Sequence, residues 1–307
     1  MRIARTSPGG SVPVRVTAMG AATAAALLVA GCSSGSGGGG STSLKALGHL
    51  RADANASKTV TYLDSARVRK LGAADPKRFS SVGQPGSGLL GGYEPAPWGP
   101  SVTAARIDTA VDSNVSGHWD GSFDTAAITA SLKKNGYTSL DQDGEQVWKP
   151  ADGDSGPRFV FSRSEIRYAT GSTPFSAVDP GHDDSLAGQQ DYRVVADCLG
   201  DVYRADFNAL TAAKPVRLSA LGQQADDAGK NTEVLCVAVK DRATADRLAD
   251  TLRTVVKDQA PRFAGTAVTV DKGDHPVVRA SVPDTSAQRP GRLFLTDMQL
   301  WLAVGRM

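Results

Sequence analysis

Hydrophobic residues recur along this chain with two alternating periods, one typical of helices and one typical of strands. Residues 243–258 predict an amphipathic helix, since their apolar side chains share one face. Residues 124–137 predict a second helix, which begins at a capping Asp124 and ends at Gly136. Residues 189–201 carry a third run with helical spacing. The inward positions that define these helices are Ala245, Leu248, Leu252 and Val255, then Ala127, Ile128 and Leu132, then Val195 and Leu199.

Between the helices the pattern changes to that of β-strands. Strands are predicted in residues 60–63, 115–123, 158–171, 202–207, 231–241 and 292–305. Two further segments predict hairpins, 137–150 with a turn at Asp143-Gly144 and 266–284 with a turn near Gly273. The fold class predicted is therefore α+β with mainly antiparallel sheets.

A repeat is predicted within this pattern. Residues 158–171 align with residues 292–305 without a gap at an offset of 134, and the apolar positions coincide. A β-α-β-β unit used twice would build two ferredoxin-like lobes, residues 113–210 and 228–307, after an N-terminal strand-helix segment in residues 45–112.

Glycine and proline interrupt the pattern in residues 80–100, which predict a long loop. The loop contains Gly86, Gly88 and Gly91 in the spacing of a dinucleotide-binding motif, but neither a strand before it nor a helix after it is predicted. Trp98 in the same loop is interpreted as a plug over one end of a sheet, with a contact surface for a partner as the alternative.

The N-terminal end has the pattern of an export signal. Its first residues carry three arginines and no acidic residue, and an uncharged apolar run follows from Val16 to Ala30. That run is too short to span a bilayer, which needs about 20 apolar residues. Residues 1–31 are therefore predicted to be a signal peptide.

The end of this segment, Val29-Ala30-Gly31-Cys32, resembles the lipobox of bacterial lipoproteins. The resemblance implies cleavage between Gly31 and Cys32 and attachment of acyl chains to Cys32. Two or three acyl chains hold a protein on a membrane far more firmly than one. Residues 32–44, rich in Ser and Gly, would then form a flexible tether. An ordinary signal peptide with a chance cysteine is the alternative.

Charge and cysteine content agree with an exported protein that does not bind nucleic acid. Without residues 1–31 and their three arginines, 31 basic residues face 32 acidic ones, with no basic run. Cys198 and Cys236 form an even pair, which predicts a disulfide in an oxidising compartment, with two separate buried thiols as the alternative.

Candidate chemistry is sparse. His49, His182 and His275 lie beside the tether or in turn-like contexts, whereas His118 adjoins an aromatic residue and a carboxylate on a predicted strand. No paired metal-ligand spacing and no nucleophile motif occurs, so no catalytic residue, cofactor or metal site is predicted. His118, Asp120 and Asp124 are the first suspects if the protein is an exported hydrolase.

Residues 121–148 contain a Phe-Asp pair, a predicted helix, a Gly-Tyr pair and a predicted hairpin, in that order. With this element, the lipobox and the Ala/Asp/Arg-rich composition, the chain resembles uncharacterised actinobacterial cell-envelope lipoproteins. This resemblance implies a location at the cell envelope and does not imply an activity. The function predicted is a non-enzymatic binding or structural module, held on the outer face of the cell membrane by lipid on Cys32. Its expected partner is an envelope protein, a cell-wall polymer or a small ligand. A solute-binding receptor of an import system is the alternative.

Overall fold

The computed structural model describes residues 41–53, 58–90, 97–142, 144–152, 156–209 and 215–307 of the chain. The predicted signal peptide, Gly31 and Cys32 lie outside the described residues. The end of the predicted tether is helical instead, because helix α1 (Thr42–Leu47) begins there and the Ser41 side chain accepts a hydrogen bond from the Leu44 backbone N–H.

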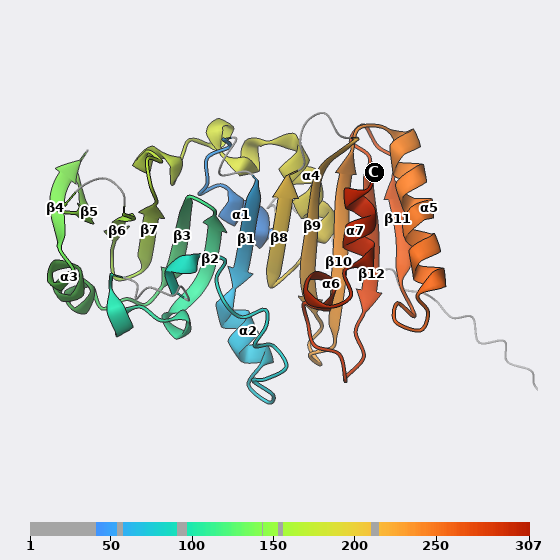
Figure 1. Ribbon diagram of the computed structural model, residues 1–307, viewed down its shortest axis with the longest axis horizontal. Helices are drawn as coiled ribbons and strands as arrows, with labels where there is room; N and C mark the ends of the chain where they lie inside the picture. Colours follow the sequence, from blue (N-terminus) through green and yellow to red (C-terminus); the bar gives the residue numbers. More distant parts are fainter. Residues whose placement is uncertain (1–40, 54–57, 91–96, 143, 153–155, 210–214) are drawn as a thin grey trace, which may run out of the picture. The chain divides into compact units, whose positions relative to one another are not determined.

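Twelve strands form one antiparallel sheet in the order β11-β12-β10-β9-β8-β1-β2-β3-β7-β6-β5-β4 (Figure 1). They are β1 (Thr59–Asp64), β2 (Ile107–Ser113), β3 (Ser116–Gly121), β4 (Tyr137–Gln142), β5 (Glu145–Pro150), β6 (Arg158–Phe161), β7 (Glu165–Ala169), β8 (Arg204–Ala209), β9 (Val216–Ala225), β10 (Asn231–Val239), β11 (Ala267–Asp271) and β12 (Val277–Pro283). The prediction of an α+β fold with mainly antiparallel strands is confirmed.

Helices pack against both faces of this sheet. They are α1, α2 (Ser65–Leu71), α3 (Thr125–Lys134), α4 (Gln190–Leu199), α5 (Arg242–Asp258), α6 (Arg292–Leu295) and α7 (Gln299–Gly305). Helix α4 lies on one face, and α5 and α7 lie on the other. Short 3₁₀ turns lie at Gly88–Leu90, Gly99–Ser101, Ala104–Arg106, Phe175–Ala177, His182–Asp184 and Leu186–Gly188. The predicted Asp124 cap of α3 is confirmed, since its carboxylate accepts a hydrogen bond from the Ala127 backbone N–H.

The two halves of the sheet are alike in how their central strands pair, but their connections differ. Helix α2 lies between β1 and β2, and four strands follow α3 where two follow α5. In the first half, β1, β2 and β3 pair in turn, α3 follows, and β7 returns to pair with β3. In the second half, β8, β9 and β10 pair in turn, α5 follows, and β12 returns to pair with β10. The halves meet where β1 and β8 pair antiparallel, with Tyr62 opposite Ala205. All these strands therefore belong to one sheet, and two separate ferredoxin-like lobes are not confirmed.

The predicted repeat at an offset of 134 is not confirmed either. Residues 158–171 contain β6 and β7, whereas residues 292–305 form α6 and α7, so the strand predicted there is wrong. The apolar positions that suggested a strand, among them Leu300, Ala303 and Val304, point into the core at helical spacing.

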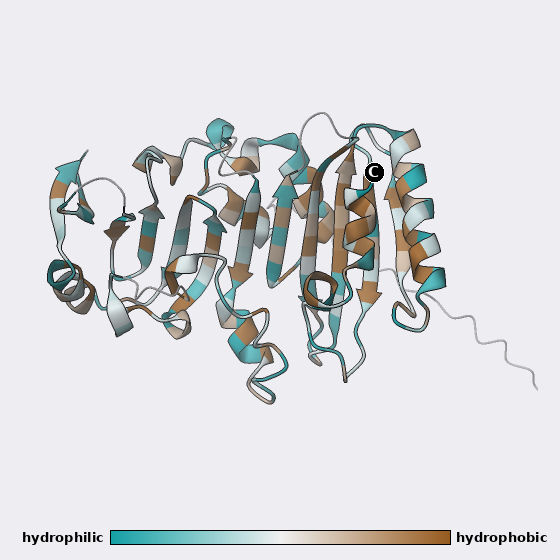
Figure 2. Ribbon diagram, viewed as in Figure 1, coloured by the Kyte–Doolittle hydropathy of each residue, from teal (hydrophilic) through white to brown (hydrophobic). Residues whose placement is uncertain are grey.

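Strands β2 and β9 fall in segments for which the pattern predicts no element. For β9, burial on both faces explains why the strand pattern is missing. The sheet is covered on both faces around β9 and β10, so these strands lack the alternation of polar and apolar residues. In β10, Cys236 packs with α4 on one face, and Val237 packs with α5 and α7 on the other. Figure 2 shows the ribbon of β10 as hydrophobic over most of its length.

Two predicted packing features are present. Cys198 in α4 and Cys236 in β10 form a disulfide, with 6.1 Å between their Cα atoms. Trp98 is only 1% exposed and packs against Trp119 and Phe159, so its loop covers the sheet as predicted.

Candidate functional site

Two histidines and an aspartate from distant parts of the chain lie together beside β3. His49 follows α1, His118 lies in β3, and Asp179 follows the 3₁₀ turn after β7. Each offers a ligand atom within 4.8 Å of the other two. The site therefore depends on the tertiary fold, because no two of its members are close in sequence.

Backbone contacts hold His49 against Asp179. The Asp179 backbone N–H donates a hydrogen bond of 2.9 Å to the His49 carbonyl oxygen, and the adjacent Leu50 forms a β-bridge with Val178. Asp179 has a φ of 54°, in the left-handed region that aspartate tolerates better than most residues. This conformation places its carboxylate beside both imidazole rings.

The Asp179 carboxylate is shared by the two histidines. Its Oδ1 atom lies 2.5 Å from His49 Nδ1 and 3.3 Å from His118 Nδ1. The two imidazole rings stack, with centroids 3.9 Å apart and planes inclined by 24°. The side chain of His118 is 5% exposed, whereas those of His49 and Asp179 are 41% and 32% exposed. The cluster is therefore buried on the β3 side and open to solvent on the other.

Asp120 completes the surroundings of His118. Its Oδ1 atom lies 3.2 Å from His118 Nε2, and its Oδ2 atom accepts a hydrogen bond of 2.7 Å from the Thr109 hydroxyl. His118 thus has one ring nitrogen facing Asp120 and the other facing Asp179.

The carboxylates change the pKa values in this cluster. Burial disfavours the charged imidazolium of His118, but Asp120 and Asp179 outweigh burial and raise its pKa to about 9. Burial alone would raise the pKa of Asp179, but His118 and His49 hold it well below its usual range. The hydrogen bond from His118 lowers the pKa of Asp120. A positive charge on His118 is consequently stabilised at neutral pH.

Arg167 of β7 connects the cluster to a neighbouring pocket. Its guanidinium lies 3.4 Å from Asp179 Oδ2, pairs with Glu145 of β5, and lies over the Phe175 ring with its Cζ atom 5.9 Å from the centroid. Burial opposes its charge, but Glu145 and the other acids raise the pKa of Arg167. Arg167 therefore connects Asp179 with Glu145 along the lining of the pocket.

The pocket has a volume of about 500 Å³. Its lining combines donors, acceptors and apolar groups: Gln142, Glu145, Arg158, Arg167, Ser176 and Asp179 on the polar side, and Val147, Pro174, Phe175 and Val178 on the apolar side. Such a lining is typical of a binding site, in which apolar contact area is combined with a few placed polar groups.

The candidate residues from the sequence lie in different parts of the structure. His118 and Asp120 are in contact within this cluster, whereas Asp124 is the cap of α3. His182 and His275 are exposed. No local motif marks His49 and Asp179 as a pair, because 130 residues separate them along the chain.

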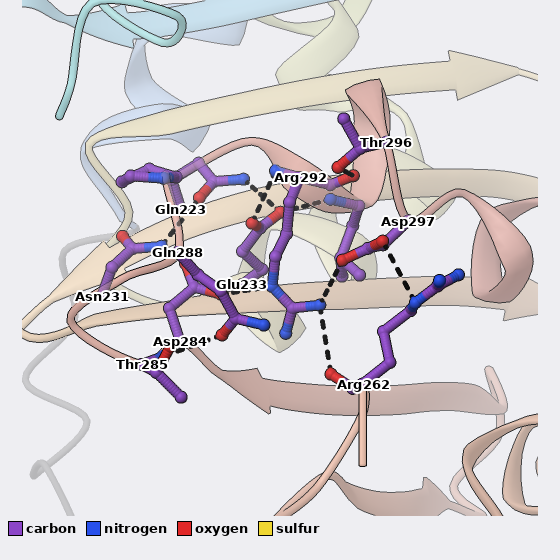
Figure 3. Close-up of polar contacts among 12 residues, drawn as sticks. Gln223, Asn231, Glu233, Arg262, Asp284, Thr285, Gln288, Arg292, Thr296 and Asp297 are labelled. Atoms are coloured by element: carbon purple, nitrogen blue, oxygen red, sulfur yellow. Dashed lines mark hydrogen bonds and ion pairs between the residues drawn. The ribbon is translucent and has the colours of Figure 1, made fainter. Parts of the chain in front are cut away.

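A second polar cluster is buried near the C-terminal helices (Figure 3). Glu233 of β10 accepts hydrogen bonds from the backbone N–H groups of Arg292 and Leu293, at the start of α6. Arg292 in turn donates to Asp284 Oδ1 across 2.6 Å and to Asp297 Oδ2 across 2.9 Å. These contacts join α6 to the sheet, so the role we assign to this cluster is structural.

No family model matches the chain, and no curated protein and no solved structure matches it either. Within the described residues, every helix is too short or too polar to cross a bilayer.

Proposed function

We propose that this protein is a lipid-anchored binding module on the outer face of the cell membrane, and that the pocket beside Asp179 binds a saccharide unit of a cell-wall polymer. The anchor in this proposal is Cys32. The observation that carries the binding role is the mixed lining of the pocket.

The charge of the pocket favours a neutral ligand. Arg158 and Arg167 are matched by Glu145 and Asp179 in the same lining, so the pocket carries little net charge. A small ligand with several negative charges would have to compete with these carboxylates for the guanidinium groups. A polyhydroxylated ring does not, because its hydroxyls donate to carboxylates and accept from guanidinium groups at the same time.

The apolar residues fit the other surface of a sugar. A pyranose ring has C–H groups on its faces, and Phe175, Pro174 and Val147 supply apolar contact area. The guanidinium groups of Arg158 and Arg167 and the two carboxylates in the same lining offer donors and acceptors to the ring hydroxyls. These two features together favour a saccharide over an apolar ligand.

Export is supported by the cysteines. The Cys198–Cys236 disulfide is the state expected in an oxidising compartment, which agrees with a signal peptide and a lipid anchor.

The alternatives gain less support. Trp119 and Trp148, which a ligand cleft between two lobes would expose, are core residues at 0% and 2% exposure. A hydrolase would use His118 and Asp120, but Asp124 is engaged at the helix cap. The binding module is therefore the function that we propose.

Saturation-transfer NMR tests the proposal. The full chain in detergent is mixed with glucose, N-acetylglucosamine or glucuronate, and transfer to the ring protons of at least one saccharide is expected. Phe175→Ala should abolish the transfer. The matched control is Phe294→Ala, since Phe294 is 47% exposed on α6 and far from the pocket lining.

No transfer to any of the three saccharides would contradict the proposal. Equal transfer in the wild type and in Phe175→Ala would also contradict it, because binding would then occur elsewhere.

A further inference from the structure

We infer that His49, His118 and Asp179 form a binding site for a Zn²⁺ ion. This site is separate from the saccharide proposal in its chemistry and in its test, although Asp179 borders both.

The ligand atoms have the right types and nearly the right separations. Zinc in proteins takes imidazole nitrogens and carboxylate oxygens at about 2.0–2.2 Å, so two ligands of a tetrahedral ion stand about 3.4 Å apart. His118 Nδ1 and Asp179 Oδ1 are already 3.3 Å apart. His49 Nδ1, at 2.5 Å from the same oxygen, must withdraw by roughly 1 Å. A metal lies in the plane of each imidazole that binds it, so the His49 ring must also turn out of its stack with His118. Its side chain is 41% exposed, so it has space for both movements.

A buried nitrogen without a hydrogen bond points to an absent ligand. His118 is 4% exposed, and its Nδ1 atom has no group in hydrogen-bond geometry within the described part of the chain. Asp179 Oδ1 faces this nitrogen at 3.3 Å as an ion pair, outside hydrogen-bond geometry. Buried polar atoms are nearly always satisfied, so this exception requires an explanation, and a metal ion bound to the lone pair provides one.

The other nitrogen of His118 is held as in known zinc sites. Metal-binding histidines usually donate their second ring N–H to a carboxylate, which fixes the ring and its tautomer. Asp120 occupies that position at 3.2 Å from His118 Nε2, and Thr109 fixes Asp120 in turn. In the metal-bound state one proton stays on Nε2, and Zn²⁺ displaces the proton that Nδ1 carries when His118 is charged.

The donor set selects the metal. Two imidazole nitrogens with one carboxylate suit zinc, whereas calcium and magnesium require oxygen ligands. Arg167 lies near Asp179 Oδ2, so the aspartate would bind through Oδ1 alone. Three protein ligands leave a fourth position for water or for an oxygen of a bound molecule.

Zinc would also hold the segment after α1 against the sheet. His49 comes from the segment directly after α1, and His118 lies in β3, so one ion would join the residues that follow the predicted tether to the sheet. A ligand that binds only the folded state raises the melting temperature as its concentration increases.

Equilibrium dialysis of the full chain in detergent against Zn²⁺, after removal of metals with a chelator, tests the site. The wild type should bind one zinc ion, and Co²⁺ at the same site should give a visible absorption spectrum of tetrahedral coordination. Either His49→Ala or Asp179→Asn should abolish stoichiometric binding of both metals. Asparagine tolerates the φ of 54° at position 179, so the second variant removes a charge and keeps the backbone.

Two further variants separate a metal site from a structural cluster. Asp120→Asn should weaken zinc binding about 10- to 100-fold without unfolding the protein, because the side chain is 54% exposed. His275→Ala removes an exposed histidine in the turn between β11 and β12 and should leave binding unchanged. A wild type that binds no zinc, or undiminished binding in His49→Ala, would overturn the inference.

Discussion

The indole N–H of Trp119 donates a hydrogen bond of 2.6 Å to Oδ1 of Asp112, a carboxylate that is 2% exposed in the middle of the sheet. The Tyr168 hydroxyl donates to the same oxygen across 2.7 Å, and the Gly86 backbone N–H donates to Oδ2 across 2.9 Å. One carboxylate thus connects β2, β3 and β7 with the loop that covers them. Burial raises the pKa of Asp112, although these hydrogen bonds oppose the shift.

Asp112→Ala should destabilise the protein by about 3 kcal/mol or more, because several buried donors lose their acceptor and each costs about 1–3 kcal/mol. Urea denaturation followed by tryptophan fluorescence measures the loss. Asp108→Ala on the same strand is the control, since the Asp108 side chain is 53% exposed and its ion pair with Arg69 contributes little. Equal stability of the Asp112 and Asp108 variants would contradict this interpretation.

The disulfide should contribute about 2–4 kcal/mol, because it closes a loop of 38 residues in the unfolded chain. Replacing both Cys198 and Cys236 by alanine should lower the melting temperature in calorimetry. Reductant should lower that of the wild type toward the variant and leave the variant unchanged. A wild type whose melting temperature resists complete reduction would show that the bond adds no stability.

Glu233 should make stability depend on pH. Burial, followed by the charge of Asp284, raises the pKa of Glu233 to about 7. The unfolded chain releases this proton near pH 4.5 and the folded protein near 7, so the free energy of unfolding falls as pH rises between these values. Glu233→Gln should reduce that slope in denaturation curves from pH 5 to pH 8. Part of the slope would remain in this variant, because burial also raises the pKa of Asp284. An unchanged slope would contradict the assignment to Glu233.

Trp98→Ala should cost about 3–5 kcal/mol, the usual loss for a large buried aromatic side chain. Trp98 is 1% exposed and packs on Trp119 and Phe159. Phe294→Ala on α6 is the matched truncation of an exposed ring and should change stability by less than about 0.5 kcal/mol. If the two truncations cost the same in urea denaturation, the loop with Trp98 is no part of the core.

Cys32→Ala should release the protein from the membrane fraction, because the acyl chains proposed at Cys32 would be lost. Fractionation of cells that express the full chain measures this, with Cys198→Ala as the control that keeps the anchor. Retention of the Cys32 variant in the membrane would show that another element holds the protein there.

Local signals account for what the sequence could predict. The caps and apolar faces of α3 and α5 depend on residues within a few positions of one another, and the cysteine pair needed only an even count. Residues 292–305 lack such caps, and Leu300, Ala303 and Val304 are as compatible with a buried strand as with a helix.

The candidate site depends on long-range placement. His49 and Asp179 meet because Leu50 bridges Val178, a pairing of backbone groups that leaves no trace in side-chain pattern. His118 and Asp120 could be selected because they alternate on one strand. Their partners appear only when α1 and the turn after β7 are packed against β3.

The pairing of β1 with β8 means that neither half of the chain is complete by itself. A chain that ended before residue 204 would leave β1 with an unpaired edge, at a strand whose side chains are mostly buried. Such an edge is a template for a strand from another copy. Truncation at the midpoint should therefore yield intermolecular exchange or aggregation rather than two working domains.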